Sequence, residues 1–386
     1  MNELFSSDLR SAYSTAEAIT ESVILPNAER VDQECLWPAD SLRALRAAGL
    51  TGLTAPARLG GLGQGLLGLA AITEIIGRGC PSTAMCFGMH CVATAVIAAK
   101  ATPYQDKHYL TPIAAGEHFT TLALSEAGSG SQFFLPHTRL QRDGSSFIVD
   151  GNKQFVTNGS HADSYVVSTQ ASTESELGEF SCVIVDRELP GLRWGEPWRG
   201  VGMRGNDSRA MQLDGVRVPL DNLLGQEGEQ VWYVFEVVAP FFLTAMAGTY
   251  LGVAHAALNA TVQHLKSRQY EHSGAPLGQI ETVQHRVGEM WMELEKTRLL
   301  VYRAAQLGDL GSANAMLSIL ASKAAAADTA VRITNEAMTL SGGIAYRENS
   351  ALARALRDAR ASHVMAPTTD LLKIWTGRTV LGIPLL

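Results

Sequence analysis

Hydrophobic and polar positions recur with two different periods along the chain, and the changes of period divide it into three parts. From residue 6 to about residue 119, apolar side chains recur with helical spacing. Residues 40–49 predict a short capped helix that is closed by Gly49, and residues 67–77 and 83–99 predict two longer helices. Helical spacing returns at residue 231 and continues to the end of the chain.

The C-terminal part carries two long apolar stripes, each on one face of a predicted helix. The first stripe comprises Val287, Met290, Leu294, Val301 and Ala304, and the second comprises Met316, Leu320, Ala324, Ala327 and Val331. Stripes of this length predict a four-helix bundle with surplus apolar surface for contact with other subunits.

The central part has the shorter period of β-strands, and turn residues separate its apolar runs. The runs lie at 146–150, 164–168, 181–185 and 211–218. The sequence therefore predicts a mostly α-helical fold with a central β domain. We expect an N-terminal helical domain at 1–119, a middle antiparallel β-barrel at 120–229 and a C-terminal four-helix bundle at 230–386.

Composition and charge argue against several classes of protein. The chain has 386 residues, of which 46% are hydrophobic and 18% charged, and its net charge of -7 argues against nucleic acid as a partner. The N-terminus lacks a basic and apolar leader, and no apolar stretch reaches spanning length without interruption, so we expect no membrane span and a cytoplasmic protein. Five cysteines without a Cys-x-x-Cys pair predict reduced thiols and no metal site.

Two segments rich in small and hydroxyl-bearing residues stand out among the predicted strands. They are Leu124-Ser125-Glu126-Ala127-Gly128-Ser129-Gly130-Ser131-Gln132 and Gly151-Asn152-Lys153-Gln154-Phe155-Val156-Thr157-Asn158-Gly159. Backbone N–H groups and hydroxyls without bulky neighbours can approach a flat or phosphorylated ligand closely. The dinucleotide fingerprint is not completed, because residue 133 is Phe.

In this order and spacing, the two segments resemble the middle domain of the acyl-CoA dehydrogenase family. That family carries Leu-Thr-Glu-Pro-x-x-Gly-Ser-Asp and Trp/Phe-Ile-Thr-Asn-Gly segments around a flavin. The resemblance covers essentially the whole chain, including the glycine-rich turn at 60–63, residues 202–208 and Gly342-Gly343. It implies FAD as cofactor, an acyl thioester on CoA or an acyl carrier protein as substrate, and a homotetramer or homodimer. The electron acceptor would be an electron-transfer flavoprotein or O₂.

The resemblance also implies which residues hold the cofactor and substrate. Ser125 stands where the family has a Thr at the edge of the flavin ring, and Arg268 where it has an arginine that reaches a neighbouring subunit's flavin diphosphate. The implied cofactor-binding residues are Leu124, Ser125, Gly130, Ser131, Phe155, Thr157, Arg268, Gly342, Gly343 and Thr368. Ser131 and Met365 are the implied substrate contacts.

The family's usual catalytic carboxylate is missing from this chain. Ala366 stands where the family has Glu, and Phe242 occupies the position that supplies the base in some other members. Asp370, about one turn beyond Ala366, is our first candidate for a base, and His363, one turn before it, is the second. Glu236 is the third.

Three functions follow as hypotheses. The first is an FAD-dependent enzyme acting on CH–CH donors, which removes the α- and β-hydrogens of an acyl thioester. The second keeps the fold and changes the reaction, either to a desulfinase-like elimination or to a flavin monooxygenase. The third is a non-enzymatic helical scaffold, which would have no use for the two hydroxyl-rich segments or for Arg268.

Overall fold

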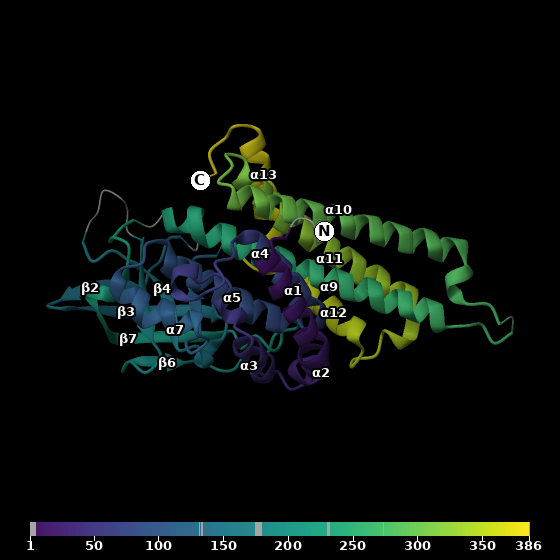
Figure 1. Cartoon of the computed structure of the whole chain (residues 1–386), viewed down its shortest axis with the longest axis horizontal. Helices are drawn as coiled ribbons and strands as arrows, with labels where there is room; N and C mark the ends of the chain where they lie inside the picture. Colours follow the sequence, from purple (N-terminus) through teal and green to yellow (C-terminus); the bar gives the residue numbers. More distant parts are fainter. Residues whose placement is uncertain are drawn as a thin grey trace.

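The structure is a computed structural model, which describes residues 5–130, 132, 134–173, 180–229, 232–272 and 274–385. The β domain lies at one end of an elongated chain, and long helices extend from it to the other end (Figure 1). The N-terminal helices pack beside the junction of the two parts. The predicted fold class, a mostly helical chain around a central β domain, is confirmed.

The N-terminal part is helical, as predicted. Its main helices are α1 (Ser7–Ile19), α2 (Leu25–Gln33), α3 (Ala39–Ala47), α4 (Leu66–Gly79) and α5 (Pro81–Ala99), followed by the short α6 (Pro103–Gln105) and α7 (Thr111–Ala114). A π-helical turn, η2 (Thr20–Ile24), joins α1 to α2. The predicted stop at Gly49 takes φ +71°, a backbone conformation that glycine adopts without strain.

The middle part consists of two four-stranded sheets. The strands are β1 (Thr120–Ala123), β2 (Arg139–Asp143), β3 (Ser146–Val156), β4 (Ser164–Gln170), β5 (Phe180–Asp186), β6 (Leu192–Trp194), β7 (Arg209–Pro219) and β8 (Leu223–Leu224). The sheet orders are β1-β4-β5-β8 and β2-β3-β7-β6. The expectation of an all-antiparallel barrel needs one correction, because β1 and β4 pair in parallel. A parallel pair needs a long crossover, and β2 and β3 supply it.

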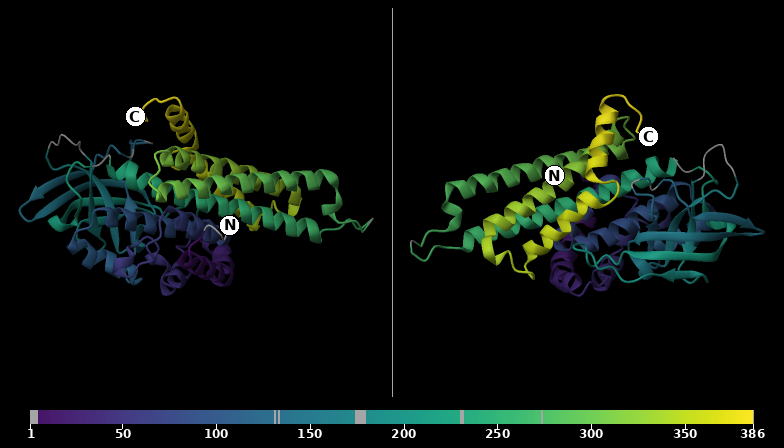
Figure 2. Two further views of the ribbon diagram at one scale, coloured as in Figure 1. Left: turned by 45° about the horizontal axis from the view of Figure 1, so that its top comes forward. Right: turned by 180° about the vertical axis from the view of Figure 1, so that it is seen from behind.

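The C-terminal part is a bundle of long helices, as predicted. It comprises η8 (Tyr233–Val238), α9 (Ala239–Ser267), α10 (Glu281–Asp309), α11 (Ala315–Ser341), α12 (Ala351–Val364) and α13 (Thr369–Val380). Both predicted stripes face inward, and residues such as Leu294, Val301 and Leu320 are buried. The last helix, α13, projects from the side of the bundle (Figure 2).

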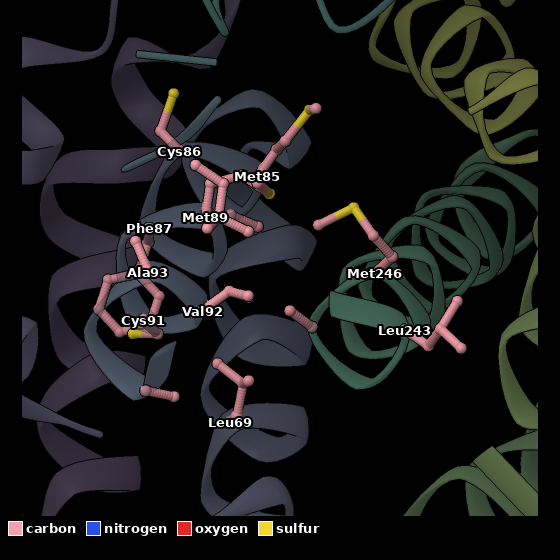
Figure 3. Close-up of a cluster of buried hydrophobic side chains, with 14 of the residues drawn as sticks. Leu69, Met85, Cys86, Phe87, Met89, Cys91, Val92, Ala93, Leu243 and Met246 are labelled. Carbon is pink, nitrogen blue, oxygen red and sulfur yellow. The ribbon is translucent and has the colours of Figure 1, made fainter. Parts of the chain in front are cut away.

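The largest contact between the N-terminal part and the bundle is made by α4 and α5 against α9. Met246 of α9 points across this contact toward the helices that carry Leu69, Met85 and Met89, while Leu243 points away from them (Figure 3). The helix α5 and the continuous helix at 233–267 are apolar and long enough to span a membrane. The expectation that no apolar stretch reaches this length was therefore wrong. However, 89% of each apolar window is buried inside the protein, as in a core helix.

Candidate active site

A buried ion pair holds the two hydroxyl-rich segments together. The Lys153 Nζ donates to Glu126 Oε1 at 2.6 Å and to Ser168 Oγ at 2.9 Å, and the amide of Gln154 donates to the Ser125 carbonyl at 2.7 Å. Glu126 also accepts hydrogen bonds from the Thr138 amide and hydroxyl, at 3.1 and 2.7 Å. The loop after β1 is therefore fixed against the end of β3.

Burial and charge act in opposite directions on the pKa values of this pair. Burial lowers the pKa of Lys153 to about 8, although Glu126 opposes the shift. Burial alone would raise the pKa of Glu126, but the charge of Lys153 and its hydrogen bond lower it. The sequence analysis identified the two segments but did not predict the ion pair between them. The signal for it was one glutamate in the first segment and one lysine in the second, each among small or strand-forming residues.

The end of β3 presents an aromatic ring to solvent. Phe155 has φ +56° and a side chain that is 64% exposed, and its ring meets Trp198 edge-on at 6.1 Å. Thr157 is buried, with its hydroxyl 3.2 Å from that of Ser208. Asn158 anchors the turn by donating to the Cys86 carbonyl at 3.0 Å. The strand end is thus rigid beneath an exposed ring.

The loop after Ser125 leaves open space around its glycines. Gly128 and Gly130 take φ +92° and +53°, and a Cβ at either position would meet nothing within 4 Å. Leu124 and Ser125 are half-buried, and Gly130 is exposed. Ser131, predicted to bind both cofactor and substrate, lies outside the described residues.

The bend between α12 and α13 carries the predicted residues Met365 and Thr368. The Thr368 hydroxyl accepts a hydrogen bond from the Leu371 amide at 3.3 Å and so caps α13. Met365 Sδ lies 4.0 Å from the Tyr250 hydroxyl of α9. Both side chains are partly buried, and their positions are fixed by neighbouring helices.

None of the three proposed bases, Asp370, His363 and Glu236, is fully buried. Asp370 is exposed in the first turn of α13, and Glu236 is exposed on η8. His363 is half-buried and faces α11, where its Nε2 lies 3.5 Å from Asp328. Burial lowers the pKa of His363. Because a base for a weak carbon acid must be held close to it in a dry site, the exposure of Asp370 weakens its candidacy.

The loop at 201–208 is tied to α12. Asp358 is buried, accepts a hydrogen bond from the Met203 amide at 2.6 Å, and has a pKa that burial raises to about 6. Arg357 pairs with Asp32 and donates to the Val201 carbonyl at 2.9 Å. These residues join the β domain to the bundle.

Arg268 lies far from the hydroxyl-rich segments of its own chain. It ends α9, where its amide donates to the His264 carbonyl at 2.9 Å, and its side chain is exposed. The connection from α9 to α10 lies at the opposite end of the bundle from the β domain (Figure 1). Gly342 and Gly343, both exposed, follow α11, which runs in the same direction as α9. One chain therefore does not bring Arg268 together with Ser125, Phe155 and Thr157.

Three family models match successive parts of the chain. The acyl-CoA dehydrogenase N-terminal domain matches residues 6–117, the middle domain residues 121–216 and the C-terminal domain residues 243–381. The chain is 32% identical to cyclohex-1-ene-1-carbonyl-CoA dehydrogenase of Geobacter metallireducens, over 93% of this chain and 94% of that protein. It is 28% identical to human short-chain specific acyl-CoA dehydrogenase, over 93% and 87%.

A solved structure shares the fold over nearly the whole chain. It is butyryl-CoA dehydrogenase from Megasphaera elsdenii, with a TM-score of 0.92 and 24% identity, over 98% of this chain and 99% of that one. The resemblance inferred from the two hydroxyl-rich segments is thereby confirmed. The chain belongs to the acyl-CoA dehydrogenase family, whose members are oxidoreductases acting on CH–CH donors.

Proposed function

We propose that this chain is an FAD-dependent dehydrogenase that removes the α- and β-hydrogens of an acyl thioester carried on CoA or an acyl carrier protein. The observation that carries the proposal is the Lys153–Glu126 pair, which fixes the loop after β1 against the end of β3. Ser125 and the exposed ring of Phe155 thereby lie on adjoining segments, in a chain of this family.

The residues present fit FAD. The exposed Phe155 ring beside a loop with open glycine positions suits a flat ring system. Bound FAD would supply the hydride acceptor for the β-hydrogen. Ser125 and Thr157 would hold its ring end, together with Leu124, Gly130 and Thr368.

The diphosphate of FAD would be held by a second chain. Arg268 is exposed, and its guanidinium forms no hydrogen bond or ion pair within the described part of the chain, so it is available to a phosphate. Arg268 cannot reach Ser125 of its own chain, because the end of α9 and the β domain lie at opposite ends of the bundle (Figure 1). We therefore infer a homodimer or homotetramer in which Arg268, Gly342 and Gly343 complete the site of a neighbour.

The α-proton needs an acceptor that this family usually supplies at the position of Ala366. Asp370 and His363 are the nearest titratable groups in sequence on either side, and Met365 would line the substrate site with Ser131. Electrons would pass on to an electron-transfer flavoprotein or to O₂. We place the enzyme in the cytoplasm, without nucleic acid or a membrane as partner.

The alternative is a different reaction on the same site, and Ala366 is the observation that favours it. A desulfinase-like cleavage breaks the C–S bond, releases SO₂ and leaves the electron pair on carbon, which then takes up a proton. Neither this reaction nor oxygen chemistry as in a flavin monooxygenase needs an α-proton acceptor. A non-enzymatic scaffold is disfavoured, since it would not need a clamped loop or an exposed Phe155.

The deciding experiment uses FAD-loaded protein without oxygen. We expect the flavin absorbance to bleach on mixing with at least one member of a panel of acyl-CoA and carrier-bound thioesters. A desaturated acyl product should appear by mass spectrometry in the same reaction. Bleaching by no thioester would overturn dehydrogenation, and the elimination and oxygen-dependent reactions would then be tested on the same panel.

A further inference from the structure

A cavity of about 360 Å³ lies between the N-terminal helices and the bundle, away from the two hydroxyl-rich segments. Its walls come from η2, from the junction of α4 with α5, from α9 and from the first turns of α12. This volume falls within the range of small-molecule sites.

Small side chains create the cavity. Glycines are required at the close contacts beside it, because a Cβ on Gly77 would lie 2.6 Å from the Thr249 carbonyl oxygen, and one on Gly79 would lie 2.8 Å from the Thr20 methyl group. The facing stretch of α9 contributes the small side chains of Ala256, Ala257 and Ala260. The helix backbones therefore meet, and the space beside them stays unfilled.

A buried hydroxyl without a partner lines the cavity. Thr20 is 6% exposed, and its Oγ1 has no hydrogen-bond partner in the described part of the chain. An unsatisfied buried polar group is unfavourable and rare in folded proteins. Thr20 also begins the π-helical turn η2, and π-helical turns within helices are frequent at functional sites.

One cationic side chain in the wall of the cavity is available to bind a ligand. Arg354 of α12 is half-buried, and its guanidinium forms no hydrogen bond or ion pair with any described residue. Arg78, in contrast, is already paired with Glu17 at 3.1 Å.

Neither of the remaining acidic side chains forms an ion pair with Arg354 in the described part of the chain. Glu21 is exposed to solvent, where salt screens its charge. Asp358 is bound to the Met203 amide, and burial raises its pKa to about 6. The cavity thus combines a guanidinium without an ion-pair partner among the described residues and an apolar wall from Leu25, Val253 and Leu352.

We propose that this cavity is a second ligand site, which binds a small organic carboxylate. Arg354 binds the carboxylate group, and Leu25, Val253 and Leu352 contact the hydrocarbon part. A guanidinium matches a carboxylate in geometry and charge.

Binding there is connected to the proposed flavin site through one loop. Asp358 lines the cavity and holds Met203, and the same loop continues to Ser208, whose hydroxyl contacts that of Thr157. The second site therefore shares a loop with the proposed flavin site, and the binding proposed here does not depend on which reaction the flavin site performs.

The test is calorimetric titration of sodium hexanoate into the full-length, FAD-loaded protein. We expect saturable binding, with acetate and 1-hexanol each binding more weakly because one lacks the hydrocarbon part and the other the charge. Arg354→Met should weaken hexanoate binding by about tenfold or more, since a charged hydrogen-bond partner is lost. Ala256→Leu should abolish it by filling the cavity.

Arg360→Met is the matched control, because Arg360 is an exposed arginine on the same helix outside the cavity. It should bind hexanoate as the wild type does, and thermal melting should show both arginine variants folded. The proposal is wrong if hexanoate shows no saturable binding to the wild type, or if Arg354→Met binds it as tightly as Arg360→Met. Tighter binding of inorganic phosphate than of hexanoate would also overturn it, in favour of a phosphate site.

Discussion

The buried Lys323 Nζ lies 2.7 Å from the carbonyl oxygen of Ser362 and so caps the C-terminal end of α12 from α11. It also donates to the Pro367 carbonyl, at 3.1 Å. A cation at the end of a helix is favourably placed against the helix dipole. One lysine therefore holds both sides of the bend that carries Met365 and Ala366.

Replacing Lys323 by Met should destabilise the protein at neutral pH. The Pro367 carbonyl would lose its donor from Lys323, and the Ser362 carbonyl would keep only the longer hydrogen bond from the Thr369 hydroxyl, at 3.3 Å. We expect this to lower the free energy of unfolding by about 1–3 kcal/mol. Urea denaturation measures the change. Lys373→Met is the control, since Lys373 is half-exposed and pairs with the part-exposed Asp328, so a change within about 0.5 kcal/mol is expected there.

The stability contributed at position 323 should also depend on pH. Burial lowers the pKa of Lys323 to about 8 in the folded protein, below its value in the unfolded chain. Between these two values the unfolded chain binds more protons, so the free energy of unfolding should rise with pH, by on the order of 2–3 kcal/mol. Denaturation of wild type and Lys323→Met in parallel tests this, because the variant should lack the rise. Equal slopes in both proteins would contradict it.

Glu126→Gln should strongly destabilise the middle domain. The change leaves the Lys153 ammonium buried without a countercharge, which we expect to lower the free energy of unfolding by on the order of 3 kcal/mol. The double variant Glu126→Gln with Lys153→Met should be less destabilised than the sum of the single variants. Glu117→Gln, at an exposed carboxylate, is the control. Simple additivity in this cycle would show that the pair is not coupled.

Arg268→Ala should weaken FAD retention more than folding. The side chain is exposed at the end of α9, so its removal takes away the proposed phosphate contact and little buried surface. FAD content after gel filtration and the melting temperature are measured together. Lys266→Ala is the control, because Lys266 is an exposed cation two residues away. Equal FAD loss in both variants would indicate a general effect of charge.

Sequence patterns predicted most of the fold because they act locally. Helical spacing located the bundle stripes, and turn residues located strands such as β3 and β7. The parallel pairing of Thr120–Ala123 with β4 was not predictable, since it joins residues more than forty positions apart in sequence, and no local signal fixes such a pairing.

The candidate site was predictable only in part. Ser125, Phe155 and Thr157 were predicted as site residues from their motifs, and the structure brings their segments together. Lys153, Glu126 and Lys323 were missed, because a buried charge looks like an exposed one in a single sequence. Only tertiary contacts show the pairing that allows each to be buried.

The last prediction concerns the proton acceptor. If the chain dehydrogenates an acyl thioester with Asp370 as base, Asp370→Asn should retain FAD and bleach about 10²–10⁴-fold more slowly with the thioester that bleaches the wild type. His363→Gln is the parallel variant, and it should be the slower of the two if His363 is the base. His363 would first have to leave Asp328, 3.5 Å away, so Asp328→Asn should alter the pH dependence of bleaching only in that case. Asp370 is exposed and needs no such release, but it must become dry when substrate binds. Wild-type rates in both variants would place the acceptor elsewhere, while FAD loss would show a structural role.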